Sequence, residues 1–264
     1  MTRAVLSPES PLFREARYLL SYEPEIRDAG LYHGVLAAVA AGNATRGGIA
    51  GYIGRKNADI AHPLDVLEDA GLLTREADAF RDNRTYHRIA EPLITFYYSV
   101  MRPVWSQLEL PGSADRVWPT RQRQFVSDVL GPCFETLCRQ WAMFYAAPGT
   151  FADLPARVSG GVVNDPGSKT THEVDVVVIG PSDGGTPAAL SIGECKTNET
   201  MGLGHLQHLR HIKELIRRGG RYDTRETKLT CYSAHGFTPE LLDLAETADD
   251  VRLVGLDDIY SVSY

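Results

Sequence analysis

The chain has 264 residues, enough for one large domain or for two smaller ones that each bury a core. Its composition, 43% hydrophobic and 23% charged, is that of a globular protein, and the net charge of −7 excludes a uniformly basic surface but not local basic patches. No stretch is apolar enough to span a bilayer and the cysteines form no CxxC pair, so we expect a cytoplasmic protein with no membrane contact and no cysteine–zinc site.

The first part of the sequence, residues 1–110, has the pattern of a winged helix with flanking helices. Three helices and then a β-hairpin are predicted, over residues 31–41, 46–54, 59–70 and 72–91. Asp59 is expected to cap the third helix, and glycine follows the first and third helices as a stop signal. Proline, glycine and serine cluster at 109–120, which indicates a domain boundary there.

Basic side chains in this first part leave DNA contact open. Arg55 and Lys56 lie between the second and third predicted helices, and their positive charges could meet phosphates. The alternative is a small helical module that binds protein, or nothing, and the sequence does not decide between the two. A further helix over 91–108 is rich in aromatic residues and is expected to pack between the two parts.

The second part, residues 120–264, has a pattern of helices alternating with strands. In order, we expect a helix, three strands, a helix, a strand, a helix and an edge strand, over 123–145, 156–163, 173–180, 188–196, 204–219, 228–236, 238–248 and 251–260. This order predicts a mixed sheet with helices on its faces, an α/β (α+β) fold. A kink is expected at Pro132 in the first of these helices.

Charged residues interrupt two strands that otherwise have the pattern of buried strands. If the turn between these strands runs over 180–189, Ile179 faces Leu190 in an antiparallel pair. Counting inward from that pair, Asp175 lies opposite Glu194. Two buried acids that face each other repel, and each would be costly to bury alone.

Lys196 completes this group, because side chains alternate along a strand and Lys196 shares the face of Glu194. Cys195 points to the other face. A divalent cation between Asp175 and Glu194 would remove their repulsion, and Mg²⁺ is held by one or two carboxylates with water and phosphate oxygens. Such a site suits phosphodiester hydrolysis, whereas the plainer alternative is an ion pair that only fixes the strand register.

The segments "EVDVVVIG" and "SIGECK" resemble the signature of the PD-(D/E)xK nuclease superfamily, with Asp175 on one strand and Glu194-Cys195-Lys196 on the next. Glu135, in "GPCFETLC", matches the acid often found on the first helix of that superfamily. Val174 stands where the proline of the motif would be. Nearly the whole chain is similar to the winged-helix and nuclease-like C-terminal region of archaeal-type and bacterial AAA+ ATPases, although no Walker A loop is present.

This resemblance implies a restriction-endonuclease-like domain and a metal-dependent DNA endonuclease that uses Mg²⁺ or Mn²⁺. Asp175, Glu194 and the backbone carbonyl of Cys195 would bind the metal, Lys196 would handle the attacking water, and Glu135 would be an outer or second-metal acid. DNA, a second copy of the chain and a separate ATPase are the expected partners. The alternative is a catalytically inactive, nuclease-like module that binds DNA or protein and works with such an ATPase.

Residues of the helix that follows the motif are candidates for nucleic-acid contact. Gln207 matches a glutamine that some relatives in the superfamily hold against the active site. A phosphate-binding surface is expected at Arg210, Arg217, Arg218 and Arg221. His205, His208 and His211 fan across about 120° of the same helix, and a metal site made of these histidines alone is the less favoured interpretation.

Overall fold

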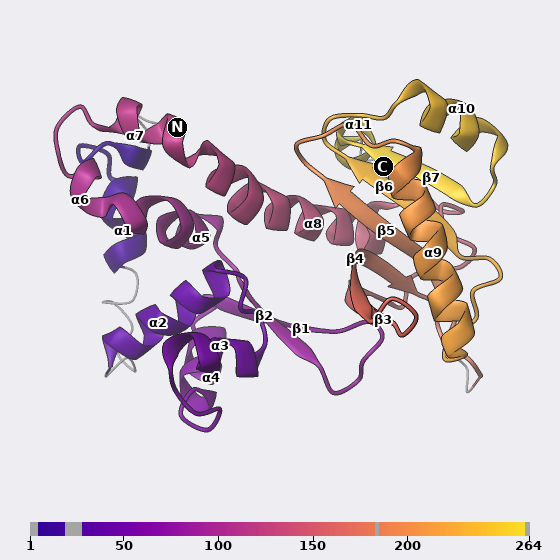
Figure 1. Cartoon of the computed structure of the whole chain (residues 1–264), viewed down its shortest axis with the longest axis horizontal. Helices are drawn as coiled ribbons and strands as arrows, with labels where there is room; N and C mark the ends of the chain where they lie inside the picture. Colours follow the sequence, from indigo (N-terminus) through magenta and orange to yellow (C-terminus); the bar gives the residue numbers. More distant parts are fainter. Residues whose placement is uncertain (1–4, 19–27, 183–184, 262–264) are drawn as a thin grey trace. The chain divides into compact units, whose positions relative to one another are not determined.

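The computed structural model describes residues 5–18, 28–182 and 185–261, which form two compact units (Figure 1). The first unit holds Met1–Glu76 and Arg84–Pro132, and the second holds Ala77–Asn83 and Cys133–Tyr264. This division differs from the expected domains in two places. The first unit extends to residue 132, and the turn at 77–83 belongs to the second unit.

The first unit has the element order of a winged helix. Its helices α2, α3 and α4 span Ala29–Ala40, Arg46–Ile53 and Ala61–Asp69, and its hairpin strands β1 and β2 span Leu73–Ala77 and Thr85–Ile89. Thr45 caps α3 by accepting a hydrogen bond from the backbone N of Gly48 (3.2 Å). The expected cap at Asp59 is wrong: α4 starts one residue later, after Ile60, and Asp59 accepts from the backbone N of Lys56 instead (3.2 Å).

Shorter helical segments complete the first unit. They are α1 (Leu12–Tyr18), α5 (Pro92–Phe96), a π-helical turn (Tyr97–Met101), a 3₁₀ turn (Arg102–Val104), α6 (Trp105–Leu108), α7 (Ala114–Gln124) and a second π-helical segment (Phe125–Leu130). Pro103 breaks the predicted helix over 91–108, because proline lacks the backbone N–H that a helix interior needs. The expected linker at 109–120 is only partly a loop, since α7 begins at Ala114 and accommodates Pro119.

The second unit is built on a five-stranded mixed sheet in the order β3-β4-β5-β6-β7. The strands span Arg157–Asp165, Thr170–Ile179, Ala189–Lys196, Lys228–Ser233 and Val251–Gly255. β3, β4 and β5 are antiparallel neighbours, whereas β5, β6 and β7 run parallel to one another. The predicted mixed sheet is therefore present, with the expected edge strand at its end.

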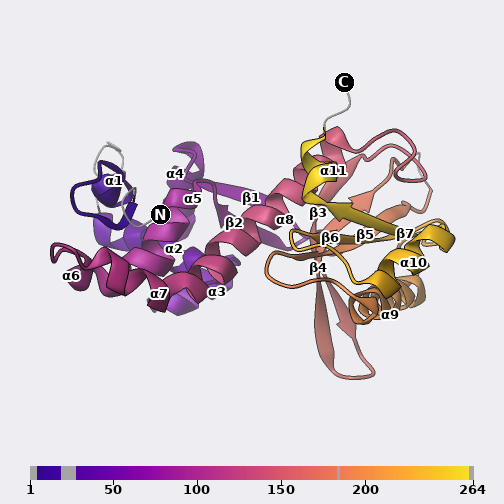
Figure 2. The ribbon, with the colours of Figure 1, turned by 90° about the horizontal axis from the view of Figure 1, so that it is seen from above.

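Helices cover both faces of this sheet (Figure 2). On one face lie α9 (Leu203–Gly219) and α10 (Pro239–Thr247), which pack through Leu206, Leu209 and Leu241. On the other face lie α8 (Gly131–Gln140), the π-helical turn Trp141–Tyr145 and α11 (Leu256–Tyr260), which pack through Phe134, Trp141 and Ile259. Within the described residues, no helix combines the length and the apolar character needed to cross a membrane.

The turn that joins β1 to β2 contributes to the core of the second unit. Ala79 and Phe80 are buried in the same cluster as α9, and the backbone N of Ala79 donates to the carbonyl of Gly160 (2.9 Å). Arg221 donates to the carbonyl of Phe80 (2.8 Å) and forms an ion pair with Asp82 (2.8 Å). The turn is thus part of this fold, although the chain reaches it from the first unit.

Candidate functional site

The junction of β4 and β5 brings the sequence motif together. Val176 pairs with Gly193, which is the register that the sequence predicts. The predicted pairing of Ile179 with Leu190 is wrong: Ile179 pairs with Ala189, because Leu190 forms a bulge. A second irregularity lies on the β3 side of β4, next to Asp175. Bulges of this kind re-aim side chains and are frequent beside active sites.

Asp175 lies where the ladder between β4 and β5 ends. Its Oδ2 accepts a hydrogen bond from the backbone N of Cys195 (2.8 Å), so the side chain replaces a strand partner. Burial raises the pKa of Asp175 to about 7, and the nearby negative charges of Glu135 and Glu194 add to this rise. A carboxyl in such surroundings stabilises either a proton or a cation placed beside it.

Glu194 and Lys196 project from β5 as a pair. The Lys196 Nζ lies 2.9 Å from Glu194 Oε1, and the side chains are 29% and 17% exposed. Burial lowers the pKa of Lys196, but the hydrogen bond and negative charge of Glu194 outweigh burial and raise it, so the ammonium stays protonated. The other oxygen of this carboxylate, Glu194 Oε2, is buried without a hydrogen-bond partner.

Arg139 is a site residue that sequence reasoning missed. This buried arginine of α8 donates to the backbone carbonyl of Asp175 (2.9 Å) and lies 3.5 Å from the Glu135 carboxylate. It therefore fixes the helix that carries Glu135 against the strand that carries Asp175. The signal in the sequence is the spacing of Glu135 and Arg139, which places them one turn apart on a helix.

The atoms of Asp175, Glu194 and Glu135 that could bind a metal are carboxylate oxygens, the ligands that Mg²⁺ and Mn²⁺ prefer. Glu194 Oε2 is an unsatisfied buried acceptor, so a cation there would provide the partner that it lacks. Among the described residues, the carboxylate oxygens of Asp175, Glu194 and Glu135 do not all lie within 4.8 Å of one another. Mg²⁺ commonly takes only one or two carboxylates and completes its coordination with water, so three converging acids are not required. Asp175 and Glu194 thus offer the kind of oxygen donors that a hard cation takes.

The Cys195 side chain faces the side of the sheet opposite to Glu194 and Lys196, as the alternation of the strand predicts, and lies on the side of α8 and Glu135. It packs in the core beneath α8 together with Cys138, and burial raises the pKa of its thiol. The Cys195 side chain therefore stays neutral in the core, and only its backbone carbonyl is suited to the role that the resemblance implies.

The histidines of α9 do not form a metal site among themselves. His205 accepts a hydrogen bond from the backbone N of Gly202 (3.1 Å) at the start of α9. His208 Nδ1 lies 3.6 Å from Glu194 Oε2, and His208 Nε2 lies 3.0 Å from His172 Nδ1. Gln207 is exposed. His208, the next residue along α9, is thus the side chain that reaches Glu194.

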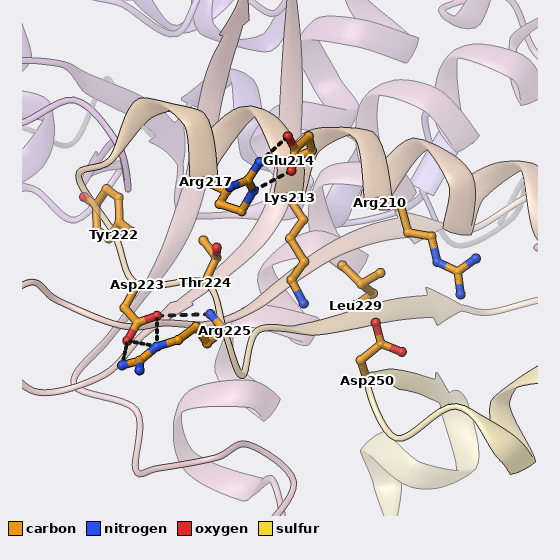
Figure 3. Close-up of a pocket in the computed structure, with 10 residues that line it drawn as sticks. All are labelled: Arg210, Lys213, Glu214, Arg217, Tyr222, Asp223, Thr224, Arg225, Leu229 and Asp250. Carbon is orange, nitrogen blue, oxygen red and sulfur yellow. Dashed lines mark hydrogen bonds and ion pairs between the residues drawn. The ribbon is translucent and has the colours of Figure 1, made fainter.

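The predicted phosphate-binding surface overlaps a shallow pocket of about 650 Å³ through Arg210 and Arg217, whereas Arg218 and Arg221 are not among its lining residues (Figure 3). Its lining residues come from α9, the following loop, the start of β6 and the turn before β7: Arg210, Lys213, Glu214, Arg217, Tyr222, Asp223, Thr224, Arg225, Leu229 and Asp250. Arg217 and Arg218 are both ion-paired with Glu214, at 2.6 and 2.8 Å, and these bonds lower the pKa of Glu214 to about 2.

The remaining arginines of the predicted surface differ in their surroundings. Arg221 is held by Phe80 and Asp82, so its charge is partly neutralised within the fold. Arg210 is exposed and lies at the end of the pocket away from the two ion pairs drawn in Figure 3. Of the four predicted phosphate contacts, Arg210 therefore has the side chain best placed to meet a phosphate.

In the first unit, Arg55 and Lys56 follow the α3 C-cap and are exposed, as a phosphate contact requires. Helix α4, which occupies the position of a recognition helix, has no lysine or arginine between Ala61 and Asp69. Two of its acids, Asp65 and Glu68, form ion pairs with Arg75 (3.2 and 3.0 Å). An acidic helix is repelled by the phosphates that line the major groove.

No family model and no curated protein matches the sequence. Among solved structures, the MepR–DNA complex of S. aureus is 17% identical, with a TM-score of 0.26, and the match covers 45% of this chain and 98% of that one. The adhesin competence repressor of Streptococcus pyogenes is 14% identical, with a TM-score of 0.25, and the match covers 46% of this chain and 96% of that one.

A third structure, protein VC1899 from Vibrio cholerae, is 14% identical, with a TM-score of 0.28. That match covers 94% of this chain but only 51% of VC1899, so the chain spans about half the length of that protein. Likenesses of this size assign neither an activity nor a ligand to the chain.

Proposed function

We propose that the chain is a metal-dependent DNA endonuclease whose site is formed by Asp175, Glu194 and Lys196. The observation that supports this most is the Asp175 carboxyl, which accepts from the backbone N of Cys195 and has its pKa raised to about 7 by burial and by the charges of Glu135 and Glu194. Carboxylates held together in this way are typical of sites that bind a cation. The resemblance of the motif to PD-(D/E)xK nucleases gives the reaction and the substrate class.

Asp175, Glu194 and the carbonyl of Cys195 would hold Mg²⁺ or Mn²⁺, and Glu135 would bind a coordinated water or a second ion. When bound, the ion would polarise the phosphoryl group and lower the pKa of a water molecule. Asp175 is kept in place from both sides, by the backbone N of Cys195 at its carboxylate and by Arg139 at its carbonyl. Little rearrangement is then needed for binding.

Lys196 would act on the water and on the transition state. Its protonated ammonium lies 2.9 Å from Glu194 and can orient the attacking water by donating a hydrogen bond to the water oxygen. The carboxylate of Glu194 can accept a hydrogen bond from the same water. The same positive charge offsets the negative charge that develops on the phosphoryl oxygens when water attacks. Glu194 thus serves both the cation and the lysine.

Cleavage of DNA tests the proposal directly. The protein is incubated with supercoiled, linear and branched DNA in Mg²⁺ or Mn²⁺, beside the variants Glu194→Gln and Lys196→Ala. We expect each variant to lose about 100-fold or more of the rate, the usual scale for removing a group that stabilises the transition state. The matched control is Glu173→Gln, an exposed acid on β4, which keeps the wild-type rate. Cleavage that survives in Glu194→Gln rejects this site.

The same experiment decides the alternative of an inactive regulatory module. Metal-indifferent binding to DNA that weakens with salt, without cleavage, favours that alternative. Two observations support this inactive alternative. The acids of α4, and the ion pairs that Arg217 and Arg218 form with Glu214, both reduce the positive charge that could bind a DNA substrate. A homodimer and a separate ATPase partner stay predictions from the resemblance.

A further inference from the structure

We infer that the second unit has a separate site for a divalent transition metal such as Zn²⁺, formed by Asp165, His172 and His211. Among the described residues, these three form a group in which one ligand atom from each lies within 4.8 Å of the other two. Two imidazoles and one carboxylate form a set that suits Zn²⁺ and related metals, whereas Mg²⁺ prefers oxygen alone. This inference does not depend on the proposed nuclease activity.

The strand register explains why the three residues meet. Val163 pairs with His172 across β3 and β4, and Asp165 follows Val163 on the same face of β3, diagonally across from His172. His211 comes from α9, which packs on that face. The end of the β3–β4 hairpin thus supplies two of the ligands, and α9 supplies the third.

The Asp165 carboxylate is oriented for a metal. Its Oδ1 accepts hydrogen bonds from the backbone N atoms of Gly167 (2.9 Å) and Ser168 (3.3 Å), so the turn holds that oxygen. Its Oδ2 lies 3.0 Å from His211 Nε2 and 3.7 Å from His172 Nε2. Ligand atoms at 2.0–2.1 Å from a tetrahedral Zn²⁺ are about 3.3 Å apart, so these spacings need only small shifts.

The hydrogen bond between His172 and His208, together with the nearby charge of Glu194, favours the tautomer of His172 that a metal needs. His208 Nδ1 lies 3.6 Å from Oε2 of Glu194, beyond hydrogen-bond distance, and the negative charge of that carboxylate favours the tautomer of a neutral His208 that has its proton on Nδ1 and its acceptor on Nε2. His172 Nδ1, 3.0 Å from that Nε2, must then be the donor. The lone pair of His172 consequently lies on Nε2, which is buried, has no hydrogen-bond partner and points toward Asp165.

A histidine that donates one ring N–H to a neighbour and binds metal through the other nitrogen is the common arrangement at protein metal sites. In this role His208 is a positioning residue, because it acts on the metal through His172. The bound metal would join the β3–β4 hairpin to α9 and leave coordination positions open for water. The ligands Asp165, His172 and His211 lie on different elements, which explains why the spacing along the sequence gave no motif.

Zinc titration of the untagged, metal-free protein by calorimetry tests the site. We expect one equivalent of tight binding in the wild type, and a loss of affinity of about 100-fold or more in Asp165→Asn and His211→Ala. Asparagine keeps an Oδ1 that can accept from the turn, so Asp165→Asn removes the ligand atom without removing the turn. His208→Ala is expected to weaken zinc binding about 10-fold.

Two controls separate this site from other sources of binding. His235→Ala removes an exposed histidine of the same unit and should keep the full equivalent. Asp175→Asn should also keep it, which distinguishes this site from the proposed nuclease site. A zinc-edge anomalous peak between Asp165 and His211 in crystals would give the location. The inference is overturned if no stoichiometric zinc binding occurs, or if the equivalent is lost in Asp175→Asn but kept in Asp165→Asn.

Discussion

Replacing Asp175 by asparagine should stabilise the metal-free protein at pH 8. The wild-type carboxyl has its pKa raised from 3.8 to about 7, chiefly by burial and then by the charge of Glu135. Asparagine removes the buried charge, and its side-chain oxygen can still accept from the backbone N of Cys195, as the carboxylate does at 2.8 Å. The substitution therefore removes a cost while it keeps the hydrogen bond.

The size of the effect follows from the pKa. A rise of about three units corresponds to about 4 kcal/mol at most, and relaxation of the site reduces this to about 1–3 kcal/mol. Between pH 4 and pH 7 the folded carboxyl retains a proton that the unfolded one has released, so the stability contributed by Asp175 falls as the pH rises. The advantage of Asp175→Asn should be present at pH 8 and nearly absent at pH 4.

Thermal unfolding followed by circular dichroism in EDTA at pH 5 and pH 8 measures the effect. We expect Asp175→Asn to melt roughly 3–10 °C above the wild type at pH 8, with a smaller difference at pH 5. Mg²⁺ should raise the melting temperature of the wild type but not of the variant, because binding to the folded state alone is stabilising. Glu173→Gln is the matched control. A variant that melts below the wild type at pH 8, or equally above it at both pH values, refutes the reasoning.

Two further predictions concern packing and DNA contact. Gly193→Ala should destabilise the protein by about 1–3 kcal/mol in urea unfolding, because the added Cβ would lie 2.6 Å from Cε2 of the buried Tyr232 ring, and an unchanged midpoint would contradict this. Arg210→Ala should weaken DNA binding and lower the salt slope by about 1, while Arg217→Ala, which removes an already paired charge, should have a smaller effect. Fluorescence anisotropy at several salt concentrations compares the two, and equal effects would count against this surface.

The sequence predicted the sheet well because its strands are long and marked by β-branched residues and turns. The helical parts were harder: Pro103 breaks the predicted helix over 91–108, whereas Pro119 lies inside α7, where a linker was expected. Propensity alone does not separate these cases, because the outcome depends on packing that the sequence does not show.

The candidate site was predictable in part for the same reason. Counting along two strands placed Asp175 near Glu194, and the bulge at Leu190 left the inner register intact. Arg139 and His208 contact Asp175 and Glu194 from helices that are distant in sequence, and the one-turn spacing of Glu135 and Arg139 links that arginine to α8 but not to Asp175. The neighbours of a site thus depend on tertiary packing even where its central residues follow from strand alternation.

The turn between β1 and β2 makes the second unit discontinuous in sequence. Phe80 fills the space that a Cβ on Gly161 would occupy, and its ring packs against Tyr222 at a centroid distance of 5.5 Å. A fragment that begins at Cys133 would lack Ala79 and Phe80 and would expose to solvent the apolar surface that they cover. A single proteolytic cut therefore cannot separate the second unit with its core complete. A truncated version of the protein has to keep residues 77–83 as well as residues 133–264.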